Sequence, residues 1–189
     1  GLSGGALTIY GGICLSMEKF KKIIEIDKEN FQAIAEPGVI TQILMDECEK
    51  EGLYYPPDPS SKGSSFLGGN LAECSGGPRA VKYGVTKDYV LGMEFVTPTG
   101  EIINSGARVL KNVTGYNLTQ LLIGSEGTLG IITKIIFRLI PLPKIKKLML
   151  AAFNDIEDCA KTVSKIFQAG ITPSALELME NSAMNAAEK

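Results

Sequence analysis

Two glycine-rich loops have residue types and spacing that suit anion binding. One is Gly-Leu-Ser-Gly-Gly-Ala at Gly1–Ala6, which leads into an apolar stretch. The other is Gly68-Gly69-Asn70, at the start of a short predicted helix. Glycine allows close backbone approach, and rows of free amides bind anions. Each loop taken alone is also typical of an ordinary turn. Together they favour a pyrophosphate ligand.

A third loop, Gly124–Gly130, reads Gly-Ser-Glu-Gly-Thr-Leu-Gly. Its spaced glycines would let the backbone approach an aromatic ring or a ribose, with the Glu126 carboxylate as a hydrogen-bond acceptor. None of the three loops has the glycine spacing and flanking elements of a dinucleotide-binding fingerprint. None has the lysine and hydroxyl residue of a P-loop.

Composition excludes several classes of chemistry. The 189 residues include no histidine, which rules out a histidine base and histidine-ligated zinc. The net charge of −2 gives no basic surface for nucleic acid. No apolar run approaches the length of a membrane span. Four cysteines without a Cys-x-x-Cys pair predict buried thiols in a reducing compartment, and hence a cytoplasmic protein.

The first third of the chain is predicted to be mostly β-structure. Strands are expected over 7–15, 22–27 and 31–35, with the last two joined as a hairpin. A helix is expected over 41–51, with Thr41 as its N-cap and Gly52 just beyond its C-terminal end. Three prolines exclude helix from the following loop, residues 54–66.

In the middle of the chain, the sequence predicts a short helix near 68–72 that is stopped by Gly76-Gly77-Pro78. A hairpin follows, with strands at 89–96 and 101–104 around Thr97-Pro98-Thr99-Gly100. A short helix at 118–123 and a β-branched strand at 131–140 complete this part. The prolines at 141 and 143 suggest a boundary between one domain at 1–143 and a second domain that starts at 144.

The segment 144–189 predicts a strand at 148–153, a helix at 155–169 and a second strand at 175–179. Such a unit is too short to bury a core of its own. We therefore expect it to be the beginning of a second domain, within a longer protein that also extends before Gly1.

Six motifs, in order over about residues 1–145, resemble the FAD-binding domain of the glycolate oxidase GlcD and D-lactate dehydrogenase family. This family belongs to the vanillyl-alcohol-oxidase-type flavoproteins with a PCMH-type FAD domain. Directly before Gly76-Gly77, this sequence has Cys74-Ser75, whereas relatives often have Asn-Ala. The motifs are Gly1–Ala6, Tyr55–Ser61, Leu67–Asn70, Gly76–Gly84, Lys111–Tyr116 and Gly124–Gly130.

The resemblance implies an α+β fold. The FAD domain would consist of two α+β subdomains with the cofactor between them, and its N-terminal part would be truncated here. Half of the pyrophosphate loop would precede Gly1. The segment 144–189 would begin a ferredoxin-like cap domain that carries the substrate.

The resemblance also assigns cofactor-binding residues, motif by motif. These are Ser3, Gly4 and Gly5 in the pyrophosphate loop; Pro57, Asp58 and Ser61 along the flavin; Gly68, Gly69 and Asn70 at a second phosphate contact; Gly76, Gly77, Tyr83 and Gly84 near the isoalloxazine; and Glu126, Gly130, Ile131 and Ile132 at the adenosine end. Arg79 and Lys82 are either cationic partners of the flavin N1 region or ordinary surface charges.

The implied function is an FAD-dependent 2-hydroxyacid dehydrogenase or oxidase, with hydride transfer from the substrate Cα to flavin N5. Without histidine, the FAD would be held noncovalently. The catalytic residues and a divalent metal would belong to the C-terminal domain, so this segment alone would be inactive. Electrons would pass to an acceptor protein, a partner oxidase subunit, a quinone or oxygen. Peripheral membrane association of the whole protein is compatible with this role.

Two different functions remain open. One is that of another flavoenzyme of the vanillyl-alcohol-oxidase type, such as an alkyl-transfer or sugar-oxidising relative. The other is that of a non-catalytic flavin or electron-transfer subunit, which would retain flavin without turnover.

Overall fold

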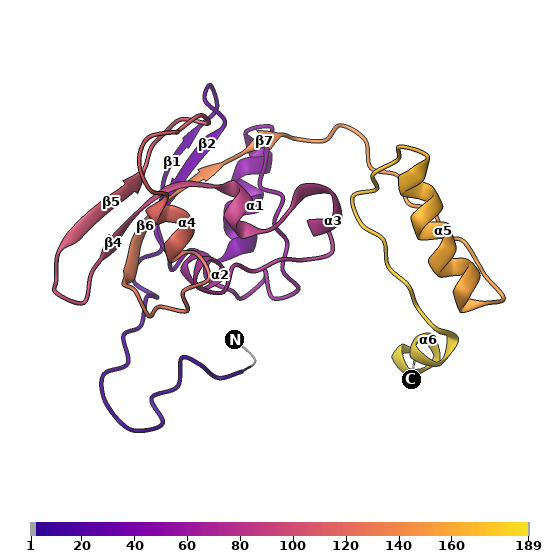
Figure 1. The fold of residues 1–189 in the computed structure, drawn as a ribbon, viewed down its shortest axis with the longest axis horizontal. Helices are drawn as coiled ribbons and strands as arrows, with labels where there is room; N and C mark the ends of the chain where they lie inside the picture. Colours follow the sequence, from indigo (N-terminus) through magenta and orange to yellow (C-terminus); the bar gives the residue numbers. More distant parts are fainter. Residues whose placement is uncertain (1–2, 189) are drawn as a thin grey trace.

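A computed structural model describes residues 3–188 of the chain (Figure 1). Its main sheet has five strands in the order β1-β2-β6-β4-β5, and all neighbouring pairs are antiparallel. The connections between β2 and β4 and between β5 and β6 carry the helices and loops of the site. The strands are β1 Ile23–Asp27, β2 Gln32–Ala35, β4 Val90–Val96, β5 Ile102–Gly106 and β6 Ile131–Arg138.

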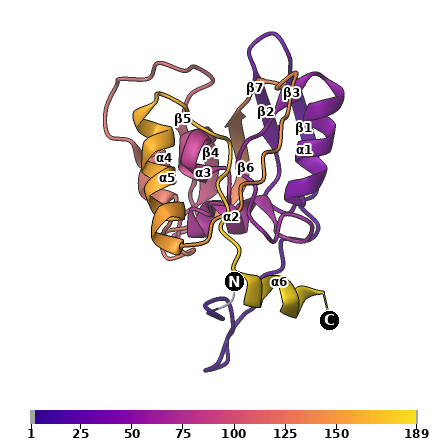
Figure 2. The ribbon, with the colours of Figure 1, turned by 90° about the vertical axis from the view of Figure 1, so that its right-hand side faces the viewer.

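A second, two-stranded sheet pairs β3, Leu53–Tyr54, with β7, Ile140–Pro141. Helices α1, α2 and α4 lie on one side of the main sheet, whereas α5 and α6 lie apart from it (Figures 1 and 2). The helices are α1 Thr41–Lys50, α2 Leu67–Glu73, α3 Ala80–Tyr83, α4 Leu118–Leu122, α5 Ile156–Gln168 and α6 Asn181–Ala187, with a 3-10 helix, η1, at Thr86–Tyr89.

The core lies between the main sheet and its covering helices. Alternate residues of a strand point to one face, so Ile135 and Phe137 of β6 both enter the core. Residues one helical turn apart do the same, as Leu44 and Cys48 of α1 show. This core holds α1 and α2 at fixed positions, and α2 forms one wall of the site.

Several sequence predictions are confirmed. The β1–β2 and β4–β5 hairpins form as expected. Helix α1 also forms, and Gly52 follows it with φ +74°, the left-handed conformation that glycine favours. The prediction that Thr41 is its N-cap is wrong, because Ile40 occupies that position. Thr41 is instead a buried residue of the first turn, whose hydroxyl bonds to the loop before α2.

The predicted strand at 7–15 does not form. Its apolar residues, including Leu7, Ile9 and Ile13, are exposed. A strand needs a hydrogen-bonded partner, and the described part of the chain supplies none for this segment. The single predicted strand at 131–140 is divided, because its last residues leave β6 and pair with β3 as β7.

Beyond Pro143 the predicted helix forms as α5, but the predicted strands at 148–153 and 175–179 do not. Helix α6 was not predicted. No residue of α5 or α6 is buried. Since amphipathic strands and helices are stabilised mainly by packing, this segment retains only the structure that local sequence supports.

The cysteine prediction is only partly confirmed. Cys48 is buried, and burial raises the pKa of its thiol to about 12. Cys14 is exposed, and Cys74 and Cys159 are half-buried. The four thiols therefore have different environments, because the segments that carry Cys14 and Cys159 lie outside the core.

Candidate functional site

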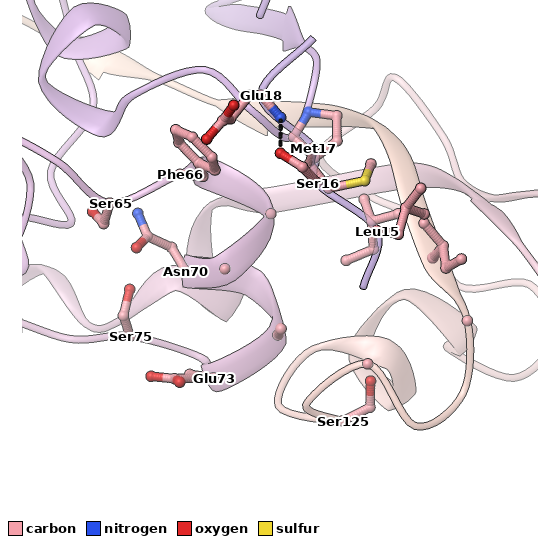
Figure 3. Close-up of a pocket in the computed structure, with 18 of the residues that line it drawn as sticks. Leu15, Ser16, Met17, Glu18, Ser65, Phe66, Asn70, Glu73, Ser75 and Ser125 are labelled. Atoms are coloured by element: carbon pink, nitrogen blue, oxygen red, sulfur yellow. Dashed lines mark hydrogen bonds between the residues drawn. The ribbon is translucent and has the colours of Figure 1, made fainter. Parts of the chain in front are cut away.

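A groove of about 860 Å³ runs between α2, the segment at 14–18 and the loop that leads into β6 (Figure 3). Seven of the predicted cofactor-binding residues line it. These are Ser61, Gly68, Gly69, Asn70, Gly130, Ile131 and Ile132. The structure thus brings together the predicted second phosphate contact and most of the predicted adenosine end, from segments about sixty residues apart in the chain.

The two glycines of α2 have different environments. A Cβ on Gly68 would lie 2.6 Å from the Pro37 Cβ, so this glycine is required for the contact between α2 and the loop after β2. A Cβ on Gly69 would meet nothing within 4 Å, and Gly69 lies on the groove. Close packing explains why residue 68 is a glycine, whereas Gly69 leaves open space where a ligand could approach the backbone.

Hydrogen bonds at the start of α2 also distinguish Gly68, which contacts the protein, from Gly69, which faces open space. The Leu67 amide donates to the Val39 carbonyl at 2.9 Å, and the Gly68 amide donates to the Pro37 carbonyl at 2.8 Å. No described acceptor is paired with the Gly69 amide. The groove therefore offers an available backbone donor beside open space.

Asn70 has a structural role in addition to lining the groove. Its side-chain Nδ2 donates to the Thr41 hydroxyl at 2.6 Å, and that hydroxyl lies 3.0 Å from the Ser65 carbonyl. In Figure 3 the Asn70 side chain extends toward Ser65. This network fixes α2 to the first turn of α1, so the position of the groove wall depends on the core.

The Gly124–Gly130 loop is attached to the other end of α2. The Gly124 amide donates to the Leu71 carbonyl at 2.9 Å, and the Glu126 amide donates to the Ala72 carbonyl at 2.8 Å. Gly124 has φ +81° and Glu126 has φ +53°, which directs the chain back toward β6. Gly130 then packs so tightly that a Cβ would lie 2.8 Å from the Val96 carbonyl oxygen. These contacts place Ile131 and Ile132 on the groove.

The predicted pyrophosphate loop lies near Glu126 and does not line the groove. A Cβ on Gly5 would lie 3.7 Å from Glu126 Oε2. Gly4 has φ +71°, as a tight turn requires. Gly1 and Leu2, the start of this motif, lie outside the described residues.

The predicted flavin-side residues form a second group, away from the groove. This group contains Pro57, Asp58, Gly76, Gly77, Tyr83 and Gly84, none of which lines the groove. Its glycines have protein neighbours. A Cβ on Gly77 would lie 2.2 Å from the Asp58 carbonyl oxygen, and one on Gly84 would lie 2.2 Å from Asp88 Oδ2. These two glycines therefore permit contacts within the chain.

Arg79 is bound within this second group. Its Nε lies 3.0 Å from Asp58 Oδ2, and its Nη1 donates to the Tyr54 hydroxyl. The Tyr54 ring packs against the Tyr83 ring, with 5.9 Å between centroids. Burial raises the pKa of Tyr54 to about 12, although the nearby Arg79 charge opposes this shift. Arg79 therefore forms an internal ion pair, which neither interpretation of the sequence predicted. Lys82 lies over the Tyr83 ring at 5.4 Å.

Sequence reasoning missed several groove residues. Ser65 and Phe66 directly precede the Leu67–Asn70 motif, and Ser125 lies inside the third loop, so their proximity to these motifs was an available signal. The segment at 14–18 gave no such signal, because Cys14 and Leu15 were predicted to end a strand and residues 16–18 belong to no motif. In the part of the chain that the structure describes, no lysine or arginine lines the groove. Backbone amides and serine hydroxyls are therefore the groove's main hydrogen-bond donors.

Cys74 and Ser75, which differ from the family pattern, follow α2 directly. Cys74 has φ +50° and packs against the core. The Ser75 hydroxyl lies 3.1 Å from the Thr86 hydroxyl, and Ser75 lines the groove. The departure thus places one polar side chain on the groove and one thiol against the core.

The Lys111–Tyr116 motif lies elsewhere, on the loop between β5 and α4. With the start of β4 it borders a separate hollow of about 360 Å³. Arg108 anchors this loop to β1 through Glu25, with N–O distances of 2.7 and 2.9 Å. Gln32 Nε2 donates to the Arg108 carbonyl at 3.1 Å.

Comparison with known families identifies two domain types. Residues 1–106 match the family described as FAD binding domain, and residues 142–189 match the C-terminal domain of FAD linked oxidases. The domain boundary predicted at 143 and 144 stays a prediction. In the described part of the chain, no helix is long and apolar enough to cross a membrane.

Individual relatives agree with these matches. The chain is 49% identical over 179 residues to glycolate oxidase subunit GlcD of Bacillus subtilis, covering 95% of this chain and 38% of that protein. It is 48% identical over 189 residues to D-lactate dehydrogenase of Anaerostipes hadrus, covering 100% and 40%. The chain thus spans about two fifths of the length of these curated relatives.

Solved structures of alkyldihydroxyacetonephosphate synthase share the fold. One has a TM-score of 0.71 at 29% identity and covers 84% of this chain and 28% of that one. A second crystal form gives a TM-score of 0.68 at 28% identity, covering 82% and 30%. The two family matches and the ordered glycine loops agree with this α+β fold. The chain belongs to the FAD-linked oxidase family that includes glycolate oxidase subunit GlcD and D-lactate dehydrogenase.

Proposed function

We propose that this chain binds FAD noncovalently, with the phosphates and adenosine in the groove along α2. The observation that carries this proposal is Gly69, which combines open space with an unpaired amide on the groove wall. Gly68, Gly69 and Asn70 would lie at the phosphates. Ile131 and Ile132 would provide an apolar wall for the adenine ring. Because no cationic side chain from residues 3–188 lines the groove, backbone amides would stabilise the diphosphate charge.

The remaining assigned residues would form the rest of the cofactor site. Ser3, Gly4 and Gly5 would complete the pyrophosphate contact near Glu126, and Ser61 would link the groove to the flavin side. The segment that includes Gly76, Gly77, Tyr83 and Gly84 would border the isoalloxazine together with Pro57. Asp58 would act within the protein, because its carboxylate is bound to Arg79.

For the longer protein we propose oxidation of a 2-hydroxyacid of the glycolate or D-lactate type. Identities of 49% and 48% to such relatives support this substrate class. FAD would supply the hydride acceptor for this oxidation, at its N5 position, and the product would be a 2-oxoacid. The groove residues bind and orient the cofactor, while the substrate-binding, metal-binding and proton-accepting residues would belong to the C-terminal domain. This chain alone would therefore not turn over substrate.

The test is the visible absorption spectrum of the longer protein, recorded before and after anaerobic addition of D-lactate or glycolate. We expect flavin bands that bleach with at least one of these substrates, because the flavin is reduced. Persistent bands with every 2-hydroxyacid would reject the proposed reaction. A colourless protein that takes up no added FAD would reject the cofactor as well. Release of the flavin by acid precipitation would support noncovalent binding.

A second candidate function is a different flavoenzyme reaction, alkyl transfer. The observation that favours it is the likeness of the fold to alkyldihydroxyacetonephosphate synthase. Alkyl transfer would leave no net reduction of the flavin. Formation of an alkyldihydroxyacetonephosphate, without bleaching by 2-hydroxyacids, would therefore favour this second function.

A further inference from the structure

Asp58 is a buried carboxylate that the proposed cofactor site does not use directly. Its side chain is 8% exposed. Oδ2 lies 3.0 Å from Arg79 Nε and 3.7 Å from Lys62 Nζ, so it forms ion pairs with both side chains. Oδ1 is buried and has no hydrogen-bond partner among the described residues. A buried acceptor without a partner costs free energy, so strong contacts nearby must fix its position.

The fixing contacts come from the segment that contains Gly77 and Arg79. A Cβ on Gly77 would lie 2.2 Å from the Asp58 carbonyl oxygen and 2.9 Å from Oδ1. The backbone at Gly77 thus closes one side of Asp58, and the Arg79 guanidinium closes another. Oδ1 is buried and Oδ2 is paired with Arg79, so we expect Asp58 to affect a cofactor through the backbone that it holds.

Arg79 extends this attachment to a third element. Its Nη1 donates to the Tyr54 hydroxyl, and its guanidinium carbon lies 5.4 Å from the centre of the Tyr54 ring. Tyr54 belongs to β3, which pairs with β7 near the end of the sheet domain. One guanidinium therefore joins the proline-rich loop, the Gly76–Gly84 segment and the small sheet.

We infer that the Asp58–Arg79 pair, with Tyr54 and the Gly77 backbone, is a positioning clamp that sets the backbone conformation of the Gly76–Gly84 segment toward the flavin. This inference rests on the proposed function, because that segment borders the isoalloxazine only if FAD binds as proposed. Asp58 and Arg79 are positioning residues in this arrangement. A planar guanidinium can hold Asp58 and Tyr54 at once, whereas a lysine ammonium lacks that fork geometry.

The test uses the longer protein as wild type and as Asp58→Asn, Arg79→Lys and Gly77→Ala. Arg108→Lys is the control, because Arg108 forms a more exposed arginine–carboxylate pair with Glu25 on β1 and is not one of the residues assigned to the cofactor. Three quantities are measured: the dissociation constant for FAD, the position and shape of the visible bands of bound flavin, and the urea midpoint of the apoprotein.

We expect Asp58→Asn, Arg79→Lys and Gly77→Ala each to weaken FAD binding about tenfold or more, equivalent to about 1.4 kcal/mol. The flavin bands should also change, because the backbone around the ring system moves. Arg108→Lys should keep the wild-type dissociation constant and bands. If Asp58→Asn does not fold, Arg79→Lys carries the test, since its side chain is partly exposed and keeps its charge.

Wild-type affinity and wild-type bands in Arg79→Lys would overturn the clamp while leaving the proposed function intact. An equal loss in Arg108→Lys would also overturn it, because the effect would then be general destabilisation. A wild-type protein that binds no FAD would reject the proposed function itself, and the clamp with it.

Discussion

At the scale of single residues, the adjacent glycines of α2 separate a folding requirement from a ligand requirement. Gly68 is in contact with Pro37, and Gly69 faces the groove with free space around it. The two positions have the same residue type and lie in the same helix. Alanine in place of Gly68 should therefore lower stability, whereas alanine in place of Gly69 should weaken cofactor binding.

We expect Gly68→Ala to lower the free energy of unfolding by about 1–3 kcal/mol, because the added methyl group overpacks against Pro37. Gly69→Ala should leave stability unchanged or raise it by about 0.5–1 kcal/mol, since alanine favours helix. The same change should weaken FAD binding, because its methyl group would occupy the groove. Urea unfolding and FAD titration of both variants check this. Undiminished FAD binding by Gly69→Ala would contradict the placement of the cofactor.

At the scale of elements, the two central strands β4 and β6 are joined by side chains as well as by backbone. The Thr133 hydroxyl donates to Glu94 Oε1 at 2.8 Å, and Lys134 Nζ lies 3.1 Å from Oε2. The Thr133 bond, followed by the Lys134 contact, lowers the pKa of Glu94 below its ordinary value of 4.5. The charged carboxylate therefore stabilises the pairing of these strands.

Because folding lowers the pKa of Glu94, the charged carboxylate stabilises the folded state above pH 4.5. This stabilisation is lost as the pH falls through the pKa that Glu94 has in the folded state. We expect Glu94→Gln to reduce this acid-induced loss, because no carboxylate remains to be protonated. Thr133→Val should also reduce it, by removing the bond that contributes most. The measurement is the urea midpoint at neutral pH and at a pH below 4.5. If both variants lose as much stability in acid as the wild type does, the contacts of Glu94 do not contribute to the acid sensitivity.

At the scale of the whole molecule, burial is confined to the part of the chain that contains the two sheets. The core residues lie between Ala33 and Leu139, while Leu148, Met149 and Leu150 are almost fully exposed. Helix α5 has an apolar face, which includes Val163 and Phe167, but no described residue buries it. The segment from 148 onward thus adds little to the stability of the rest.

Removal of residues 148–189 should leave the free energy of unfolding unchanged, because no buried contact is lost. The cut keeps Lys146, whose Nζ lies 6.0 Å from the Tyr54 ring. As a control, Phe137→Ala in the same chain should cost about 3–5 kcal/mol, since Phe137 is fully buried. Urea unfolding followed by circular dichroism compares the variants. A large loss of stability on truncation would mean that the two parts form one cooperative unit.

The sequence by itself determined the local structure and the family. Turn residues and alternating apolar residues determine the β1–β2 and β4–β5 hairpins, and helical spacing with Gly52 determines α1, because these signals act between near neighbours. The ordered glycine motifs similarly identified an FAD domain. The unformed strand at 7–15 shows the limit, since an extended apolar segment becomes a strand only beside a partner.

Only the tertiary structure decided which motif residues share a site. It placed Met17, Ser65 and Ser125 on one groove with Gly69, and it separated Asp58 and Gly77 into an internal cluster. It also showed that Gly68 is needed for packing and that Gly69 is not. The sequence alone cannot make this distinction, because both residues are glycine. These outcomes depend on contacts between segments far apart in the chain, which form when the core packs and which no local pattern encodes.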